Sequence, residues 1–109
     1  MPSSTPDDAG AVFEALGDPL RRRLVERLAE VGSSTPTRLA ADLPVTRQAV
    51  SKHLDALLAA GLVERTREGR ESRFALAPGR LELAGGWIQS VGEAWDERLR
   101  RLREHLGEE

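Results

Sequence analysis

The stretch from residue 46 to residue 63 constrains the fold most, because it contains a helix with clear signals at both ends. Thr46 is a favourable N-cap, since its hydroxyl can accept a hydrogen bond from an N–H of the first turn. Four apolar residues then recur at helical spacing and fall on one face: Val50, Leu54, Leu57 and Leu58. At Gly61 the helix reaches a residue that commonly ends a helix in the left-handed conformation, and an extended run begins with Leu62-Val63. The pattern predicts a helix over residues 46–60 with an apolar back.

The opposite face of this helix is polar near its N-terminus, where four side chains point outward together: Gln48, Ser51, Lys52 and Asp55. A short helix with an apolar back and a hydrogen-bonding front has the shape that the major groove of DNA admits. Taken alone, the same pattern is more often an ordinary amphipathic surface helix. The elements on either side decide between these two interpretations.

The chain begins with a Pro/Ser/Thr-rich segment, residues 1–7, which we expect to be a flexible arm. A first short helix is predicted over about residues 8–16. Asp18-Pro19 is a cap followed by proline at the first helical position, so a second helix starts here, and Gly32 closes it.

A third, short helix completes the N-terminal half. Ser33-Ser34 is expected to be a loop, and Thr35-Pro36 then repeats the cap-and-proline start of a helix that Pro44 ends. Only two residues separate this helix from the cap at Thr46. Two short helices joined by so tight a turn predict a helix-turn-helix whose second helix is presented outward.

After Gly61 the sequence changes to a two-residue period. Residues 62–67 and 72–76 read as two strands around a Gly-containing turn, with Leu62, Phe74 and Leu76 expected to pack inward. Four arginines are expected on the opposite side and at the tip: Arg65, Arg67, Arg70 and Arg73. A free two-stranded hairpin is only marginally stable, so this one must dock on the helices. The segment 62–77 is therefore predicted to be a basic wing beside the helix at 46–60.

A last helix is predicted over about residues 80–106, weak near Gly85-Gly86. Its apolar residues recur at helical spacing: Trp87, Ile88, Val91, Trp95, Leu99, Leu102 and Leu106. One interpretation packs this helix along its own domain. We prefer a role between subunits, because a terminal helix this long exceeds the core that it could cover.

Length, composition and charge limit the classes of protein to which this chain can belong. A chain of 109 residues is expected to form one domain, here residues 8–109, and its lack of cysteine excludes disulfides and sulfur-ligated metals. No apolar run is long enough to cross a bilayer, so cytoplasm is the expected location and no membrane partner is expected. The net charge of −2 hides an uneven distribution: residues 44–80 hold seven basic and four acidic side chains. A local excess of positive charge is what attracts DNA.

Three stretches together resemble ArsR-type winged-helix transcriptional repressors: residues 15–24, 48–54 and 60–63. With the wing, the resemblance covers residues 13 to about 77. It implies a mainly α fold with a small β-hairpin, about five helices and a two-stranded wing. It also implies a homodimer, joined through the first and last helices, that occupies a promoter and blocks transcription. The dimer residues would be Val12 and Phe13 with the stripe of the last helix from Trp87 to Leu102.

The predicted partner is therefore a double-stranded DNA operator, and the two-fold symmetry of a dimer predicts an inverted repeat. The candidate DNA-binding residues are Thr46, Arg47, Gln48, Ser51, Lys52, His53, Arg67, Arg70 and Arg73. Gln48 and Ser51 suit base edges, whereas Lys52 and the wing arginines suit the backbone. Arg47 suits either guanine or a phosphate. His53 suits a DNA contact and a bracing role within the helix equally well.

The chain departs from the metal-sensing members of that family. Those place cysteines at the start of the third helix, or paired His and carboxylate ligands on the last one. Here the third helix begins Thr35-Pro36-Thr37, and the last helix has only His105. Its acids, Glu93, Asp96 and Glu97, lie among arginines and read as an ion-pairing face. We therefore expect no metal and no cofactor, and nothing in the sequence identifies an effector.

An enzyme is not expected, because the sequence has no nucleophile with an evident base, no Gly-rich phosphate loop and no carboxylate pair in an apolar setting. The stronger rival is a winged-helix module that binds protein without sequence-specific DNA binding. The polar front of the helix at 46–60 and the arginines of the wing favour DNA.

Overall fold

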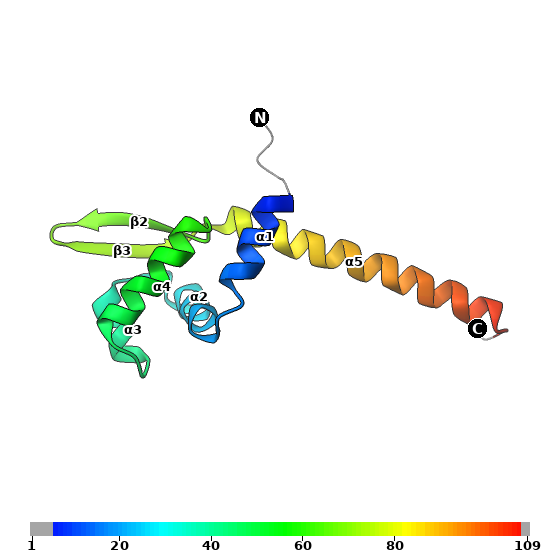
Figure 1. Cartoon of the computed structure of the whole chain (residues 1–109), viewed down its shortest axis with the longest axis horizontal. Helices are drawn as coiled ribbons and strands as arrows, with labels where there is room; N and C mark the ends of the chain where they lie inside the picture. The colour runs from blue at the N-terminus through cyan, green and yellow to red at the C-terminus, as the bar shows by residue number, and fades with distance from the viewer. Residues whose placement is uncertain (1–5, 108–109) are drawn as a thin grey trace, which may run out of the picture.

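The computed structural model describes residues 6–107 and consists of five helices and three strands. In chain order these are α1 (Pro6–Ala15), α2 (Pro19–Val31), β1 (Ser33–Ser34), α3 (Pro36–Asp42), α4 (Arg47–Ala59), β2 (Val63–Glu68), β3 (Glu71–Leu76) and α5 (Pro78–His105). Figure 1 shows α2, α3 and α4 gathered below the hairpin of β2 and β3, with α5 leading away from them. The mainly α winged helix-turn-helix architecture expected from the sequence is confirmed.

The helix starts follow their predicted caps. The Asp18 carboxylate accepts hydrogen bonds from the N–H groups of Leu20 at 2.8 Å and Arg21 at 3.1 Å. The Thr46 hydroxyl accepts one from Ala49 at 3.1 Å, and that of Thr35 caps α3 in the same way. These bonds satisfy N–H groups that a helix otherwise leaves unpaired.

The first helix differs from its predicted start. α1 begins at Pro6, two residues earlier than Asp8. Proline is favourable in the first turn of a helix, because the N–H that it lacks has no partner there. Residues 1–5, the rest of the predicted arm, lie outside the described residues.

The sheet has one more strand than the predicted hairpin. Ser33 and Ser34, expected to be a loop, pair antiparallel with Ala75 and Phe74 of β3, so the strand order is β1-β3-β2. A strand of two residues is too short to show a period of two, and it exists because β3 offers an unpaired edge. The third strand ties the wing to the segment between α2 and α3.

The apolar face of α4 lies at the centre of the core. Val50, Leu54 and Leu57 are fully buried, together with Leu24 and Leu28 of α2, and Phe74 of β3 covers the same cluster. Burying one such leucine stabilises the fold by about 1.5–3 kcal/mol. The core therefore holds α4 by its back and leaves its front at the surface.

The last helix is continuous from Pro78 to His105, through the glycine pair where the sequence predicted weakness. Near its start it packs against α1, and beyond that it extends away from the rest of the chain (Figure 1). Ala84 is its only residue of the buried core among the described residues. No helix within residues 6–107 is both long and apolar enough to cross a membrane.

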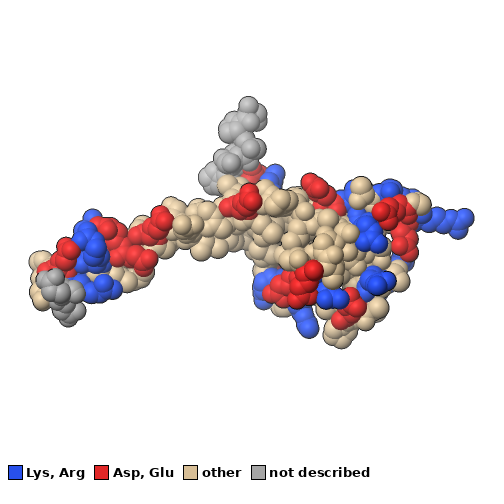
Figure 2. Space-filling model, turned by 180° about the vertical axis from the view of Figure 1, so that it is seen from behind, with Lys and Arg blue, Asp and Glu red and all other residues tan. Residues whose placement is uncertain are grey.

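Most of the predicted dimer residues form an exposed apolar strip, here called the α1/α5 strip. Its members are Phe13, Trp87, Ile88, Val91, Trp95 and Leu102, each at least 36% exposed. The rings of Phe13 and Trp87 meet edge to face, with their centroids 5.4 Å apart. Figure 2 shows that this part of α5 carries few charges between the domain and the charged far end of the helix.

One predicted dimer residue is wrong. Val12 is fully buried in the core of its own chain, so it is not available to a second subunit. The apolar residues of α1 face two ways, and Val12 points toward the core whereas Phe13 points outward. The half-buried Leu99 belongs to the same side of α5 as the strip.

Candidate nucleic-acid interface

A side-chain hydrogen bond joins the two helices of the helix-turn-helix at the start of α4. Arg47, the first residue of α4, donates a hydrogen bond from Nε to the hydroxyl of Thr37 in α3, at 2.9 Å. With the Thr46 cap on one side and the buried Val50 on the other, the first turn of α4 is held from three directions. Its outward side chains therefore project from a rigid base.

The front of α4 is open to solvent, as predicted. Gln48 and Lys52 are exposed, and neither side chain has a hydrogen bond or an ion pair with any residue in 6–107. Ser51 is half-buried and lies nearer the wing. Donors and acceptors on this face are free for an outside partner.

The wing and α4 enclose a groove of about 280 Å³. Its walls carry Arg47, Ser51 and Asp55 from α4 and Arg65, Arg67 and Arg70 from the wing. Four guanidinium groups thus line the groove between the polar front of α4 and the hairpin. Positive charge in a concave site attracts a polyanion.

The placement of the wing arginines corrects the sequence analysis. Arg65 and Arg67 were expected opposite Phe74, yet Arg65 pairs with Phe74 and Arg67 with Ser72, so both share its face of the sheet. Alternate residues of a strand face the same side, and the side is set by Val63, the buried first residue of β2. Leu62 is also buried but precedes the strand, so counting from Leu62 inverted the faces. Arg65 is thereby a groove residue that the predicted site omitted.

Arg73 lies elsewhere. It occupies the other face of the sheet, where its Nη1 donates to the Ser33 hydroxyl at 2.9 Å and its Nε to the Glu68 carboxylate at 3.3 Å. The structure therefore does not bring Arg73 together with the groove arginines. Its partner Ser33 is in β1, the strand that the sequence did not reveal.

His53 is half-buried on the side of α4 nearest to the start of α2. The pKa of the Asp18 carboxyl is held below its ordinary value, first by the N–H of Arg21, with further contributions from the N–H of Leu20 and the charges of His53 and Arg21, while burial opposes them. The His53 side chain has no hydrogen bond or ion pair with any residue in 6–107, so a DNA contact and a bracing role both stay open.

Metal ligands do not converge in the described part of the chain. Within residues 6–107 no group of three or more His, Cys, Asp or Glu side chains is placed to hold an ion. On α5, Glu97 accepts hydrogen bonds from Arg100, and Gln89 bonds Glu93 at 3.2 Å. Of the three acids expected to form an ion-pairing face, only Glu97 has an ion pair among residues 6–107, because Gln89 is neutral and Asp96 has no partner there.

Known proteins have similar sequences and the same fold. Residues 16–66 match the family described as "Helix-turn-helix domain". The HTH-type transcriptional regulator CmtR of Mycobacterium tuberculosis is 45% identical over 82 residues, which are 75% of this chain and 69% of CmtR. A solved structure of CmtR, described as a cadmium metal-sensor, is 42% identical with a TM-score of 0.57, and the match covers 72% of this chain and 81% of that one.

A second structure is more similar in shape. An ArsR-like transcriptional regulator from Rhodococcus sp. RHA1 has a TM-score of 0.76 and 36% identity, and the match covers 90% of this chain and 92% of that one. Both the sequence and the arrangement of α4 and the wing are thus those of DNA-binding regulators rather than enzymes. This chain belongs to the ArsR-type winged helix-turn-helix transcriptional regulators.

Proposed function

We propose that this regulator represses transcription as a homodimer bound to an inverted-repeat operator. The observation that carries the proposal is the free polar front of α4 beside a groove with four arginines. Because its proposed partner is chromosomal DNA, the cytoplasm remains the expected location.

Bases are read from the first turns of α4. Gln48 is exposed and unpaired within the described chain, and a glutamine can bond both the N6 and N7 positions of adenine. Ser51 lies one turn further along the same face. Arg47 is held by Thr37, so its remaining donors suit a phosphate better than a base edge.

The backbone is held by Lys52 and by the wing. Arg65, Arg67 and Arg70 line the groove beside α4, where the phosphate backbone that borders the major groove would pass. Contacts of this kind set position and affinity without reading sequence. Arg73, fastened to Ser33, is not part of this set.

The dimer uses the α1/α5 strip. Two tryptophans and their apolar neighbours are about half exposed along α5, whose residues 83–92 carry no charge, and apolar patches of this extent mark interaction sites. Pairing two copies about a two-fold axis would cover the strip and present two α4 helices to successive major grooves, about 34 Å apart.

The metal response suggested by the description of CmtR is not carried over. This chain has no cysteine, and its last helix has a single histidine, His105. Tight transition-metal sites need several convergent ligands.

Two substitutions test how the DNA is read. After the operator is recovered from genomic fragments bound by the purified protein, Gln48→Ala should weaken operator binding by about 1–3 kcal/mol and leave unrelated DNA unaffected. Arg70→Ala should weaken both alike and make the salt dependence shallower, by roughly one unit of slope for each phosphate that is no longer neutralised. Arg103→Ala, on the far end of α5, is the control for removing one positive charge.

Titrations at several salt concentrations, on operator and scrambled duplex, measure both effects. If Gln48→Ala weakened both duplexes equally while Arg70→Ala relaxed only sequence preference, the assigned roles would be wrong. If the wild type bound no duplex in a salt-dependent way, the rival protein-binding module would replace the proposal.

A third substitution tests the dimer. Trp95→Glu places a charge in the α1/α5 strip and should convert the dimer to a monomer in light scattering at micromolar concentration. Ser90→Glu adds the same charge to an exposed position of α5 outside the strip and should remain dimeric. A folded wild-type monomer at that concentration would contradict the dimer.

A further inference from the structure

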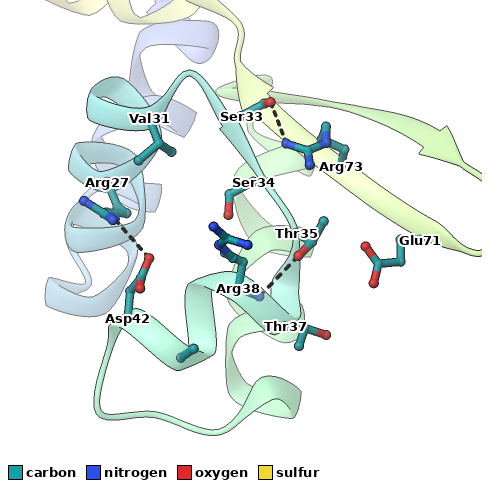
Figure 3. Close-up of a pocket in the computed structure, with 11 residues that line it drawn as sticks. Arg27, Val31, Ser33, Ser34, Thr35, Thr37, Arg38, Asp42, Glu71 and Arg73 are labelled. Atoms are coloured by element: carbon teal, nitrogen blue, oxygen red, sulfur yellow. Dashed lines mark hydrogen bonds and ion pairs between the residues drawn. The ribbon is translucent and has the colours of Figure 1, made fainter.

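A second, larger groove lies beside β1, the edge strand opposite β2 in the sheet. It measures about 570 Å³ and is bordered by the end of α2, by β1, by the start of α3 and by β3 (Figure 3). Its walls are polar, with the hydroxyls of Ser33, Ser34 and Thr35 and the guanidinium groups of Arg27, Arg38 and Arg73. A groove of this size accommodates a small ligand, and its polarity excludes an apolar one.

This groove continues the proposed DNA surface. Thr35, Thr37 and Glu71 line both it and the groove between α4 and the wing, so the two meet at the start of α3. The arginine-lined surface is thus longer than the part used in the proposed function.

Two of the three guanidinium groups are fixed by partners at the rim. Arg27 donates from Nε to Asp42 at 3.1 Å and from Nη1 to Glu30 at 3.0 Å. Arg73 is held by Ser33 and Glu68. Fixed side chains lose little freedom when a ligand arrives, although their carboxylate partners offset part of their charge.

Arg38 differs from both. Its guanidinium has no hydrogen-bond or ion-pair partner among residues 6–107, and Figure 3 shows it between the other two arginines, beside Ser34. Ser34 is 5% exposed, so its hydroxyl belongs to the floor of the groove. An unpaired guanidinium next to a hydroxyl in a concave site can bind an oxyanion through charge-assisted hydrogen bonds.

One acidic residue limits where an anion fits. Glu71 lines the end of the groove nearest the wing tip, away from Arg38 in Figure 3, and would repel an anion there. The favourable end is therefore the one formed by Arg38 and Ser34. Asp42 is on the opposite wall and is already neutralised by Arg27.

We propose that Arg38 and Ser34, with Arg73 at the rim, form a binding site for a phosphate-type oxyanion. The anion comes either from the operator backbone beyond the wing or from a free phosphate-bearing solute. The first source rests on the proposed function, because it needs the DNA to lie along α4. The second does not.

The test compares wild type, Arg38→Ala and Arg103→Ala as full-length proteins. Both substitutions remove one exposed arginine, and neither touches the core. One arm measures thermal stability with millimolar inorganic phosphate against chloride of equal ionic strength. The other arm measures operator affinity and its salt slope in phosphate-free buffer, on duplexes with short and long flanks.

Each source has its own result. A free anion predicts that phosphate raises the melting temperature of wild type and Arg103→Ala but not of Arg38→Ala, whose operator affinity stays unchanged. A backbone phosphate predicts that Arg38→Ala loses affinity about tenfold on the long duplex, with a shallower salt slope and little loss on the short one. If Arg38→Ala matches Arg103→Ala in both arms, the site does not exist. Failure of wild type to bind any duplex would overturn the proposed function, and the phosphate arm would still decide the anion site.

Discussion

Replacing Gly61 by alanine probes the junction where the DNA-reading helix meets the dimer helices. Gly61 follows α4 with a φ of +78°. Arg80 of α5 lies over it, donating from Nη1 to the carbonyl of Ala60 at 3.3 Å and pairing with Asp8 of α1 at 3.6 Å. One guanidinium therefore connects the end of α4 with both α1 and α5.

The size of the effect follows from two contributions. A non-glycine residue in the left-handed conformation costs about 1–2 kcal/mol. A Cβ at position 61 would also lie 3.2 Å from Cγ and 3.3 Å from Cζ of Arg80, so this flexible side chain must move. Losing its partly exposed bond to the Ala60 carbonyl adds about 0.5–1 kcal/mol. Gly61→Ala should thus lower the free energy of unfolding by about 1.5–3 kcal/mol.

Urea denaturation at a fixed subunit concentration measures this loss, and a double-mutant cycle separates its parts. In an Arg80→Ala background, Gly61→Ala should cost only the backbone contribution of about 1–2 kcal/mol. Gly69→Ala is the control, because Gly69 also has a positive φ, +61°, but nothing lies within 4 Å of its added Cβ. Its cost should not depend on Arg80. Equal costs of Gly61→Ala in both backgrounds would refute the role given to Arg80.

Three further predictions concern the cap, the core and metals. Folding lowers the pKa of Asp18 below its ordinary 3.8, so the ionised carboxylate stabilises the fold above that pH, and this stability is lost as the pH falls through the folded pKa. Asp18→Asn still caps α2 and should flatten the acid limb of a stability–pH curve. An unchanged acid limb would count against the role of the Asp18 charge. Leu54→Ala, which empties a fully buried position, should cost about 2–5 kcal/mol in urea denaturation. Zinc or cadmium at low micromolar concentration should leave operator affinity unchanged, and a tenfold loss that His105→Ala abolishes would contradict this.

The starts of α2, α3 and α4 were predictable because each carries its own local signal. Asp18-Pro19, Thr35-Pro36 and Thr46 specify caps within three or four residues, and the structure contains those hydrogen bonds. The buried face of α4 was equally readable, since Val50, Leu54 and Leu57 repeat at helical spacing. Local chemistry and packing agree in this part of the chain.

The features that the sequence did not reveal depend on distant partners. Ser33-Ser34 becomes a strand only because β3 is beside it, and Arg73 is fastened only because that strand exists. The face of β2 was assigned wrongly, whereas that of β3 was not, because the choice between Leu62 and Val63 decides which side of β2 is inward. Val12 was misassigned for a similar reason. Val12 and Phe13 are adjacent apolar residues of α1, and only the packing of the other helices determines which of the two is buried.

The strand order also bears on how the protein stays in solution. β2 is at the edge of the sheet, so one side of its backbone has no paired strand among residues 6–107 and could template the β-pairing of another molecule. Four of its six residues are charged: Glu64, Arg65, Arg67 and Glu68. Charges on an edge strand oppose intermolecular pairing. The arginines proposed to hold DNA therefore also protect the sheet from aggregation, and replacing Arg65 and Arg67 together by apolar residues should make the protein form β-rich aggregates at concentrations where the wild type stays soluble.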